Sequence, residues 1–180
     1  MRAVFLDRDG VINQDRDDYV KNASELNIFP FAPEAIRKLT EAGFPVFVVS
    51  NQQGVAKGLI SEDDLQAIES EITLAVEASG GKILKFYYCK HLASQNCSCR
   101  KPQPGLLTKA AKENGINLKD SIMVGDTERD IMAGKSAGCK TILLLTGHLT
   151  QQDAENIPCK PDFIAQDLFA ATEYILKTYL

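Results

Sequence analysis

The sequence has no excess of positive charge, no long apolar run and no low-complexity tract. Its 180 residues include 20 lysines and arginines against 24 aspartates and glutamates, giving a formal net charge of −4 and a pI near 5.2. This acidity argues against a nucleic-acid partner, which would require a basic surface. No apolar stretch approaches the roughly 20 residues that span a bilayer. We therefore expect neither nucleic acid nor membrane as a partner.

The N-terminus also lacks the features of a signal peptide, because the apolar run from Ala3 to Leu6 ends at once in charged residues. A cytoplasmic protein is the simplest interpretation. There is no internal repeat and no interdomain linker, and the 44% hydrophobic content is typical of a chain with one continuous core. We expect a single domain over residues 1–180 and a monomer.

Short apolar, β-branched runs alternate with helical patterns along the whole chain. The runs predict strands over 3–6, 45–51, 83–89, 121–126, 141–147 and 161–165. The helical patterns cover 32–43, 61–80, 104–115, 128–138 and 167–180. Strands that alternate with helices favour right-handed βαβ units. The sequence therefore predicts a three-layer, doubly wound α/β fold with a mostly parallel sheet, in which ligands bind beyond the carboxyl ends of the strands.

Those strand ends carry the polar residues of interest. The stretch "VFLDRDGVIN" places Asp7 and Asp9 after the first strand, and Ser50 ends the strand "PVFVVSN". The segment "GDTERD" follows a later strand, and "CRKP" contains a lysine. Taken alone, each motif could be a turn, a helix cap or a solvated loop. Together they predict a site at one edge of the sheet, made by Asp7, Asp9, Ser50, Lys101, Asp126 and Asp130.

This set of side chains suits phosphate chemistry. Carboxylates can hold Mg²⁺, which keeps coordination positions for water and a phosphate oxygen. A carboxylate can attack phosphorus to form an aspartyl-phosphate, and a second acid can transfer the protons. A hydroxyl and a lysine can stabilise the phosphoryl oxygens.

The motifs "FLDRDG", "VVSN", "CRKP" and "VGDTERD" resemble those of the haloacid dehalogenase (HAD) superfamily of phosphatases, over nearly the whole chain. The resemblance implies a HAD-like fold, Asp7 as nucleophile and Asp9 as general acid and base. It implies Ser50 and Lys101 as phosphoryl stabilisers. It implies that Asp7, the backbone carbonyl of Asp9, and Asp126 bind Mg²⁺. The spacing leaves no room for a large cap domain, so a capless, open site is expected.

A cysteine-rich loop precedes the lysine motif. "CKHLASQNCSC" contains three thiols and one imidazole, which form a complete tetrahedral ligand set for zinc. Reduced cysteines and a disulfide between the last two cysteines are the alternatives. The sequence predicts a structural Zn²⁺ site made by Cys89, His91, Cys97 and Cys99. Cys139 is expected in the core, and Cys159 receives no role.

Within the superfamily, this zinc loop resembles both heptose-bisphosphate phosphatases and histidinol-phosphate phosphatases. The stretches "NQQGVAKGLIS" and "KPQPGLL" are closer to the heptose enzymes, which implies a small phosphorylated sugar as substrate. Arg100 could grip a second phosphate bidentately. Thr127 departs from the lysine often found there in the heptose enzymes. The expected substrate-binding residues are Asp15, Tyr19, Asn51, Gln52, Gln53, Arg100 and Thr127.

Overall fold

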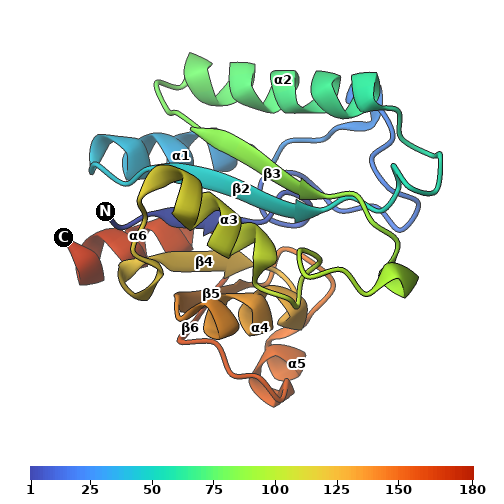
Figure 1. Cartoon of the computed structure of the whole chain (residues 1–180). Coiled ribbons are helices and arrows are strands. Elements are labelled where there is room, and N and C mark those ends of the chain that lie inside the picture. The colour runs from blue at the N-terminus through green and yellow to red at the C-terminus, as the bar shows by residue number, and fades with distance from the viewer.

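A six-stranded parallel sheet forms the centre of the protein, shown for residues 1–180 as a computed structural model in Figure 1. The strand order is β3-β2-β1-β4-β5-β6, and every neighbouring pair is parallel. The strands are β1 (Val4–Leu6), β2 (Val46–Asn51), β3 (Lys85–Cys89), β4 (Ile122–Gly125), β5 (Lys140–Leu144) and β6 (Phe163–Ala165). This topology confirms the predicted α/β class. The order reverses at β1, so the crevice where such sheets bind ligands lies between β1 and its neighbours.

Helices cover both faces of the sheet (Figure 1). They are α1 (Ala32–Glu41), α2 (Glu62–Ala78), α3 (Gly105–Asn114), α4 (Glu128–Ala137), α5 (Gln151–Asn156) and α6 (Leu168–Tyr179). Three 3₁₀ turns also occur, η1 (Ala23–Glu25), η2 (Ala93–Gln95) and η3 (Leu118–Asp120). No helix has both the length and the apolar content that crossing a bilayer would take.

Alternate strand residues supply two separate cores. Val4 and Leu6 of β1 pack with the buried faces of α1, α2 and α6. Phe5, between them in sequence, packs with Phe47 of β2 and with α3 and α4 on the opposite face. Side chains alternate between the faces of a strand, so a strand buried on both sides must be apolar throughout. This explains the unbroken apolar runs in the sequence, which hold the strand ends rigidly in register.

The helix boundaries follow ordinary capping chemistry. The side chain of Ser61 accepts a hydrogen bond from the backbone N–H of Asp64 and caps α2. Gly115 and Gly138 end α3 and α4 in the left-handed region, as their sequence positions predict. The sequence analysis did not predict α5, because "QQDAEN" has no apolar periodicity. Its first turn is held by a capping box between Thr150 and Asp153.

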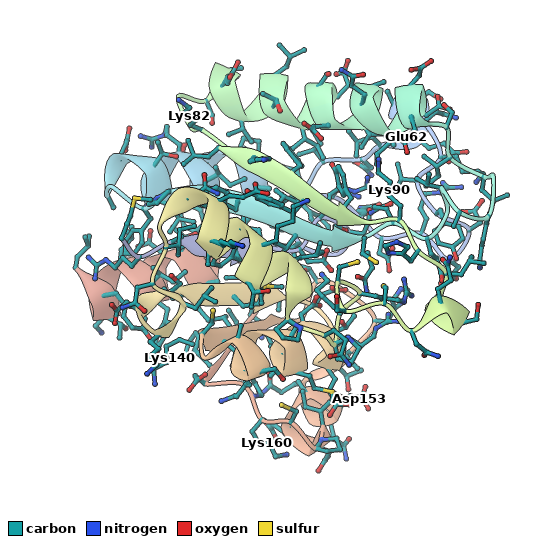
Figure 2. The ribbon with its side chains drawn as sticks, viewed as in Figure 1. Glu62, Lys82, Lys90, Lys140, Asp153 and Lys160 are labelled. Carbon is teal, nitrogen blue, oxygen red and sulfur yellow. The ribbon has the colours of Figure 1, made fainter.

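Charged side chains lie on the outside of this framework (Figure 2). Lys90, which follows β3, forms an ion pair with Glu62 in the first turn of α2. The pair links α2 to the start of the cysteine-rich loop.

We expect Ile68→Ala to lower the free energy of unfolding by about 2 to 5 kcal/mol, because it leaves a cavity in the core under α2. Leu74→Ala is the matched control on the same helix, since the Leu74 side chain is exposed. It should change stability by less than about 0.5 kcal/mol. Urea unfolding followed by circular dichroism measures both changes. Equal losses in the two variants would contradict this assignment of the buried face.

Candidate active site and metal centres

A cavity of about 330 Å³ opens at the carboxyl edge of the sheet. It is lined by five of the residues predicted to carry catalysis or bind magnesium, namely Asp7, Asp9, Ser50, Lys101 and Asp126. Six of the seven expected substrate-binding residues also line it: Asp15, Tyr19, Asn51, Gln53, Arg100 and Thr127. Residues separated by more than 100 positions in the chain therefore meet in one pocket, because parallel strands end at the same edge.

The turn after β1 brings both early aspartates to the cavity. Gly10 has a positive φ of 78°, and the carbonyl of Arg8 accepts hydrogen bonds from the N–H groups of Val11 and Ile12. In a continued strand, Asp9 would point with Asp7 toward one face of the sheet. The turn instead gives each carboxylate its own set of partners at the strand end.

Lys101 is the central cation of the site. Its Nζ lies 2.9 Å from Oδ2 of Asp7 and 2.6 Å from Oδ1 of Asp130. The same ammonium donates a hydrogen bond to the carbonyl of Val49 at 2.9 Å, which holds it at the end of β2. Burial acts to lower the pKa of Lys101, but Asp130 and Asp7 outweigh it and raise that pKa. Lys101 is therefore a fixed positive charge beside Asp7.

Asp130 was placed at this edge by its sequence position but was assigned no role. Its Oδ2 accepts hydrogen bonds from the backbone N–H and the hydroxyl of Thr127, at 3.0 and 2.7 Å. Burial opposes ionisation, yet Lys101 and then Thr127 hold the pKa of Asp130 below its usual range. Asp130 therefore anchors Lys101, whereas the Asp126 carboxylate forms no ion pair or hydrogen bond with the protein.

Asp7, Asp126 and Asp130 form a group whose oxygens lie within 4.8 Å of one another. Burial raises the pKa of Asp7 to about 7, with the neighbouring carboxylates adding to the shift against Lys101. Burial, Asp130 and Asp7 likewise raise the pKa of Asp126. Lys101 is the only ammonium beside these three carboxylates, so the group carries more negative than positive charge when all three are ionised. A hard divalent cation with oxygen ligands would supply the missing positive charge.

Two glycines make room for the Asp126 carboxylate. A Cβ atom at Gly10 or Gly147 would lie 2.2 or 2.1 Å from Oδ2 of Asp126. Any larger residue at either position would push the Asp126 carboxylate out of its present place. The cradle fits the predicted magnesium ligation by Asp7 and Asp126.

Asp9 has a different environment from Asp7. Oδ1 of Asp9 accepts from Arg8 Nε (3.1 Å), Arg8 Nη2 (2.8 Å) and Asn13 Nδ2 (2.9 Å). Oδ2 accepts from Arg8 Nη2 (3.0 Å) and Gln52 Nε2 (2.8 Å). Burial opposes ionisation, but Arg8 and these hydrogen bonds lower the pKa of Asp9. Two aspartates one residue apart thus receive opposite electrostatic environments.

The prediction that Gln52 contacts the substrate is wrong, because Gln52 lies behind the cavity wall. Its side chain is only 1% exposed and does not line the cavity. Its Nε2 donates to Asp9 and, at 3.0 Å, to the hydroxyl of Ser50. The β2 end turns this side chain inward, so Gln52 orients Ser50 and Asp9 from behind the site.

Asn51 and Gln53 both reach the cavity wall. Asn51 donates through Nδ2 to the Lys101 carbonyl and accepts through Oδ1 from the Lys101 N–H, both at 3.0 Å. This reciprocal pair fastens the lysine loop to β2. Gln53 donates to the hydroxyl of Tyr19 at 2.9 Å, and Lys57 donates to the same oxygen at 2.8 Å. Tyr19 has a φ of 68°, a strained value for an aromatic residue that is typical of functional loops.

The cavity lining contains charges of both signs. Nε2 of His148 lies 3.2 Å from Oδ2 of Asp15. Arg100 and Arg129 also line the cavity, and neither forms an ion pair. Sequence reasoning assigned no role to Arg8, Arg129 or His148. The position of Arg8 between the two aspartates could have indicated a role. Arg129 and His148 reach the cavity only through the fold.

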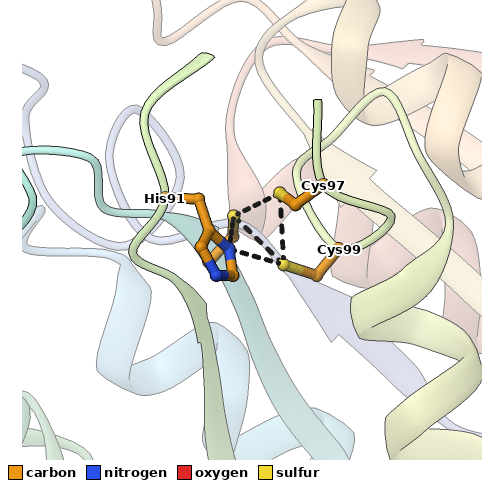
Figure 3. Close-up of side chains that lie close together, drawn as sticks. His91, Cys97 and Cys99 are labelled. Atoms are coloured by element: carbon orange, nitrogen blue, oxygen red, sulfur yellow. Dashed lines mark hydrogen bonds between the residues drawn. The ribbon is translucent and has the colours of Figure 1, made fainter. Parts of the chain in front are cut away.

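The predicted zinc ligands come together beside the active site (Figure 3). The Sγ atoms of Cys89, Cys97 and Cys99 lie 3.3 to 3.5 Å from one another. His91 Nδ1 lies 3.2 Å from Cys99 Sγ and 3.5 Å from Cys89 Sγ. A tetrahedron with Zn–S bonds of about 2.3 Å has sulfur atoms roughly 3.8 Å apart. These separations exceed a disulfide bond, so the four residues could hold one metal ion.

The remaining cysteines are free thiols. Cys139 is buried in the core on the α3 and α4 side of the sheet, which confirms its predicted place. Cys159 is partly buried near α5, and it is not among the cavity-lining residues or the four metal-ligand candidates.

Comparison with known proteins identifies the family. A HAD-hydrolase-like family model matches residues 98–171. The chain is 35% identical to a D-glycero-β-D-manno-heptose-1,7-bisphosphate 7-phosphatase of Bordetella bronchiseptica over 177 residues, covering 98% of this chain and 99% of the relative. A Pseudomonas aeruginosa protein of the same name is 35% identical over 174 residues, with 97% of each chain covered. The chain belongs to this family of HAD-like phosphatases.

Solved structures agree with this assignment. The heptose-bisphosphate phosphatase of B. bronchiseptica, complexed with magnesium and phosphate, superposes with a TM-score of 0.91 and 34% identity, over 98% of this chain and 99% of that one. The D,D-heptose 1,7-bisphosphate phosphatase of Burkholderia thailandensis has a TM-score of 0.76 and 27% identity, over 99% and 100%. The predictions of a HAD-like fold and of a phosphomonoesterase are confirmed.

We expect Mg²⁺ to raise the melting temperature more at about pH 8 than at about pH 5, because the ion must displace the proton that burial holds on Asp7. Without metal, the folded chain keeps this proton above the ordinary Asp pKa of 3.8. This contribution to stability is therefore lost as the pH rises toward about 7. Thermal unfolding with and without MgCl₂ measures the difference. A larger shift at low pH, or an unchanged shift in Asp126→Asn, would contradict the proposed ligands.

Proposed function

We propose that this protein is a D-glycero-D-manno-heptose 1,7-bisphosphate 7-phosphatase that uses an aspartyl-phosphate intermediate. Its support is twofold. Relatives of this name match it over nearly their whole length. The juxtaposition of Asp7, Lys101 and Asp126 in one cavity carries the chemistry.

In the first step, an oxygen of Asp7 attacks the phosphorus of the substrate. The bond between phosphorus and the sugar oxygen breaks, and Asp9 gives a proton to that oxygen. The dianionic phosphate beside Asp9 favours the protonated acid, whereas Arg8 favours the ionised form. The second step reverses the transfer: Asp9 takes a proton from water, whose oxygen attacks phosphorus and releases Asp7.

Ser50 and Lys101 act on the phosphoryl group during both steps. The Lys101 ammonium, fixed between Asp7 and Asp130, offsets the charge of the transferring oxygens. Ser50 presents its hydroxyl with its oxygen held by Gln52, so its hydrogen is free for a phosphoryl oxygen.

Mg²⁺ fits the site through Asp7, Asp126 and the backbone carbonyl of Asp9. When bound, it would reduce the repulsion between the nucleophile and the phosphate. The complex of the Bordetella relative with magnesium and phosphate supports this choice of cation.

The cavity lining suits a sugar with two phosphates. Arg100 and Arg129 offer unpaired positive charge for the phosphate that is not hydrolysed. Asp15 and the hydroxyl of Tyr19, which also line the cavity, can hydrogen-bond sugar hydroxyls. Histidinol phosphate, the alternative left open by the sequence, has a single phosphate and would leave those two guanidinium groups unmatched.

We also propose that Cys89, His91, Cys97 and Cys99 bind a structural Zn²⁺. The ion would close the loop that leads directly into Arg100 and Lys101. The loop has little apolar content of its own, so metal binding would supply the folding free energy that packing does not.

We expect Asp7→Asn to lower kcat by at least about a thousand-fold, because an amide is a poor nucleophile. Asp63→Asn, on the exposed face of α2, is the matched control and should retain wild-type activity. A malachite-green phosphate assay measures kcat/KM for the heptose bisphosphate and for histidinol phosphate. A tenth of the wild-type rate in Asp7→Asn would exclude the covalent mechanism. A higher kcat/KM for histidinol phosphate would contradict the proposed substrate.

Metal analysis of protein purified without chelator should give about one zinc per chain. Cys97→Ser should lose the zinc and melt at a lower temperature, because the loop loses a ligand. Cys159→Ser, which changes a cysteine outside the cluster, should keep both the zinc and the melting temperature. A well-folded wild-type protein without zinc would refute the site.

A further inference from the structure

We propose that Arg8 is a positioning residue that aims the Asp9 carboxyl at the leaving oxygen of the substrate. The inference rests on the proposed function, since it takes Asp9 as the proton donor. Arg8 itself does not line the cavity, so it acts through Asp9 and touches no reacting atom.

The burial of Arg8 calls for an explanation. Arg8 is buried, with 1% of its side chain exposed, although burying a guanidinium is costly unless it is paired. Its ion-pair partner is Asp9, whose side chain is 20% exposed to the cavity. Nη1 of Arg8 has no hydrogen-bond partner. A residue serving stability alone would be replaced at little cost by an apolar side chain of similar volume.

The geometry fixes the plane of the carboxyl group. Nε and Nη2 of Arg8 meet Oδ1 and Oδ2 of Asp9 at 3.1 and 3.0 Å, as a two-pronged fork. Asn13 and Gln52 approach the same two oxygens from other directions, at 2.9 and 2.8 Å. Rotation of the carboxyl group about its own axis would break at least two of these contacts. A single-point cation such as lysine could not impose this orientation.

Arg8 also touches the nucleophile through its backbone. Its N–H donates to Oδ1 of Asp7 at 2.7 Å. One residue therefore sets the positions of both acids, one by its main chain and the other by its side chain. The main-chain contact remains in any variant at this position, so a substitution of Arg8 changes only the hold on Asp9.

The role of Arg8 is tied to one bond-breaking event. As the Asp7 oxygen bonds to phosphorus, the bond from phosphorus to the sugar oxygen breaks, and that oxygen takes the proton of Asp9. A sugar alkoxide needs this proton, whereas p-nitrophenolate can leave without it. A misoriented Asp9 carboxyl group should therefore slow the first step for a sugar phosphate far more than for p-nitrophenyl phosphate.

The experiment measures kcat/KM for both substrates in wild type, Arg8→Lys and Arg8→Met. The value of kcat/KM reports the steps up to departure of the leaving group. Hydrolysis of the aspartyl-phosphate, which both substrates share, therefore does not affect it. We expect Arg8→Met to lower kcat/KM at least about 100-fold for the heptose bisphosphate and less than about tenfold for p-nitrophenyl phosphate. Arg8→Lys, which keeps the charge but loses the fork, should show an intermediate ratio. The ratio does not depend on the fraction of folded enzyme.

Arg37→Met is the matched control, because Arg37 pairs with Glu34 on the outside of α1. It should leave the ratio unchanged. Equal losses on both substrates, or a wild-type ratio in Arg8→Lys, would overturn the positioning role. If the wild-type enzyme does not hydrolyse the heptose bisphosphate but hydrolyses another alkyl phosphate, the proposed substrate is wrong. The same ratio, measured with that alkyl phosphate, then still tests Arg8.

Discussion

Three carboxylates grouped around one buried ammonium at the end of a parallel sheet set the constraint on which the site depends. Lys101 pairs with Asp7 and Asp130, and Asp126 lies in the same group, so the negative charge exceeds the positive charge when all three acids are ionised. Burial, and after it the neighbouring carboxylates, raise the pKa of Asp7 and Asp126. A site built this way favours a divalent cation and a phosphate together, because each compensates charge that the other leaves exposed. The family relationship to phosphatases is consistent with that electrostatic balance.

The position of Lys101 depends on two attachments with different chemistry. On one side, Asn51 forms a reciprocal pair with its backbone and fastens it to β2. On the other, the cysteine-rich loop leads into it through Arg100, and four metal-ligating side chains gather there. The backbone of Lys101 is thus held from two directions, while its ammonium bonds to the carbonyl of Val49 in β2. The loop can remain polar and open to substrate while its lysine stays fixed.

Asp7 and Asp9 show how one short motif produces two chemical environments. The glycine turn separates their partners, so that Asp7 faces carboxylates and an ammonium, whereas Asp9 faces the Arg8 guanidinium. Burial is common to both groups, and the neighbouring charges and hydrogen-bond donors differ. Ionisation states in this site therefore follow from the side chains that surround each acid, and not from depth in the protein.

The sequence by itself determined the fold class, the strand and helix order, and the edge of the sheet that carries chemistry. Apolar runs, helical periodicity and glycine stops are local signals, and parallel strands have only one shared carboxyl edge. The short helix α5 was missed because its polar sequence has no apolar face. Only the tertiary structure decided that Gln52 turns behind the site, that Asp130 anchors Lys101, and that Arg8 pairs with Asp9. Arg129 and His148 reach the rim in the same way. These outcomes depend on contacts across elements and on which side of a turn a side chain takes, and no periodicity in the chain encodes either.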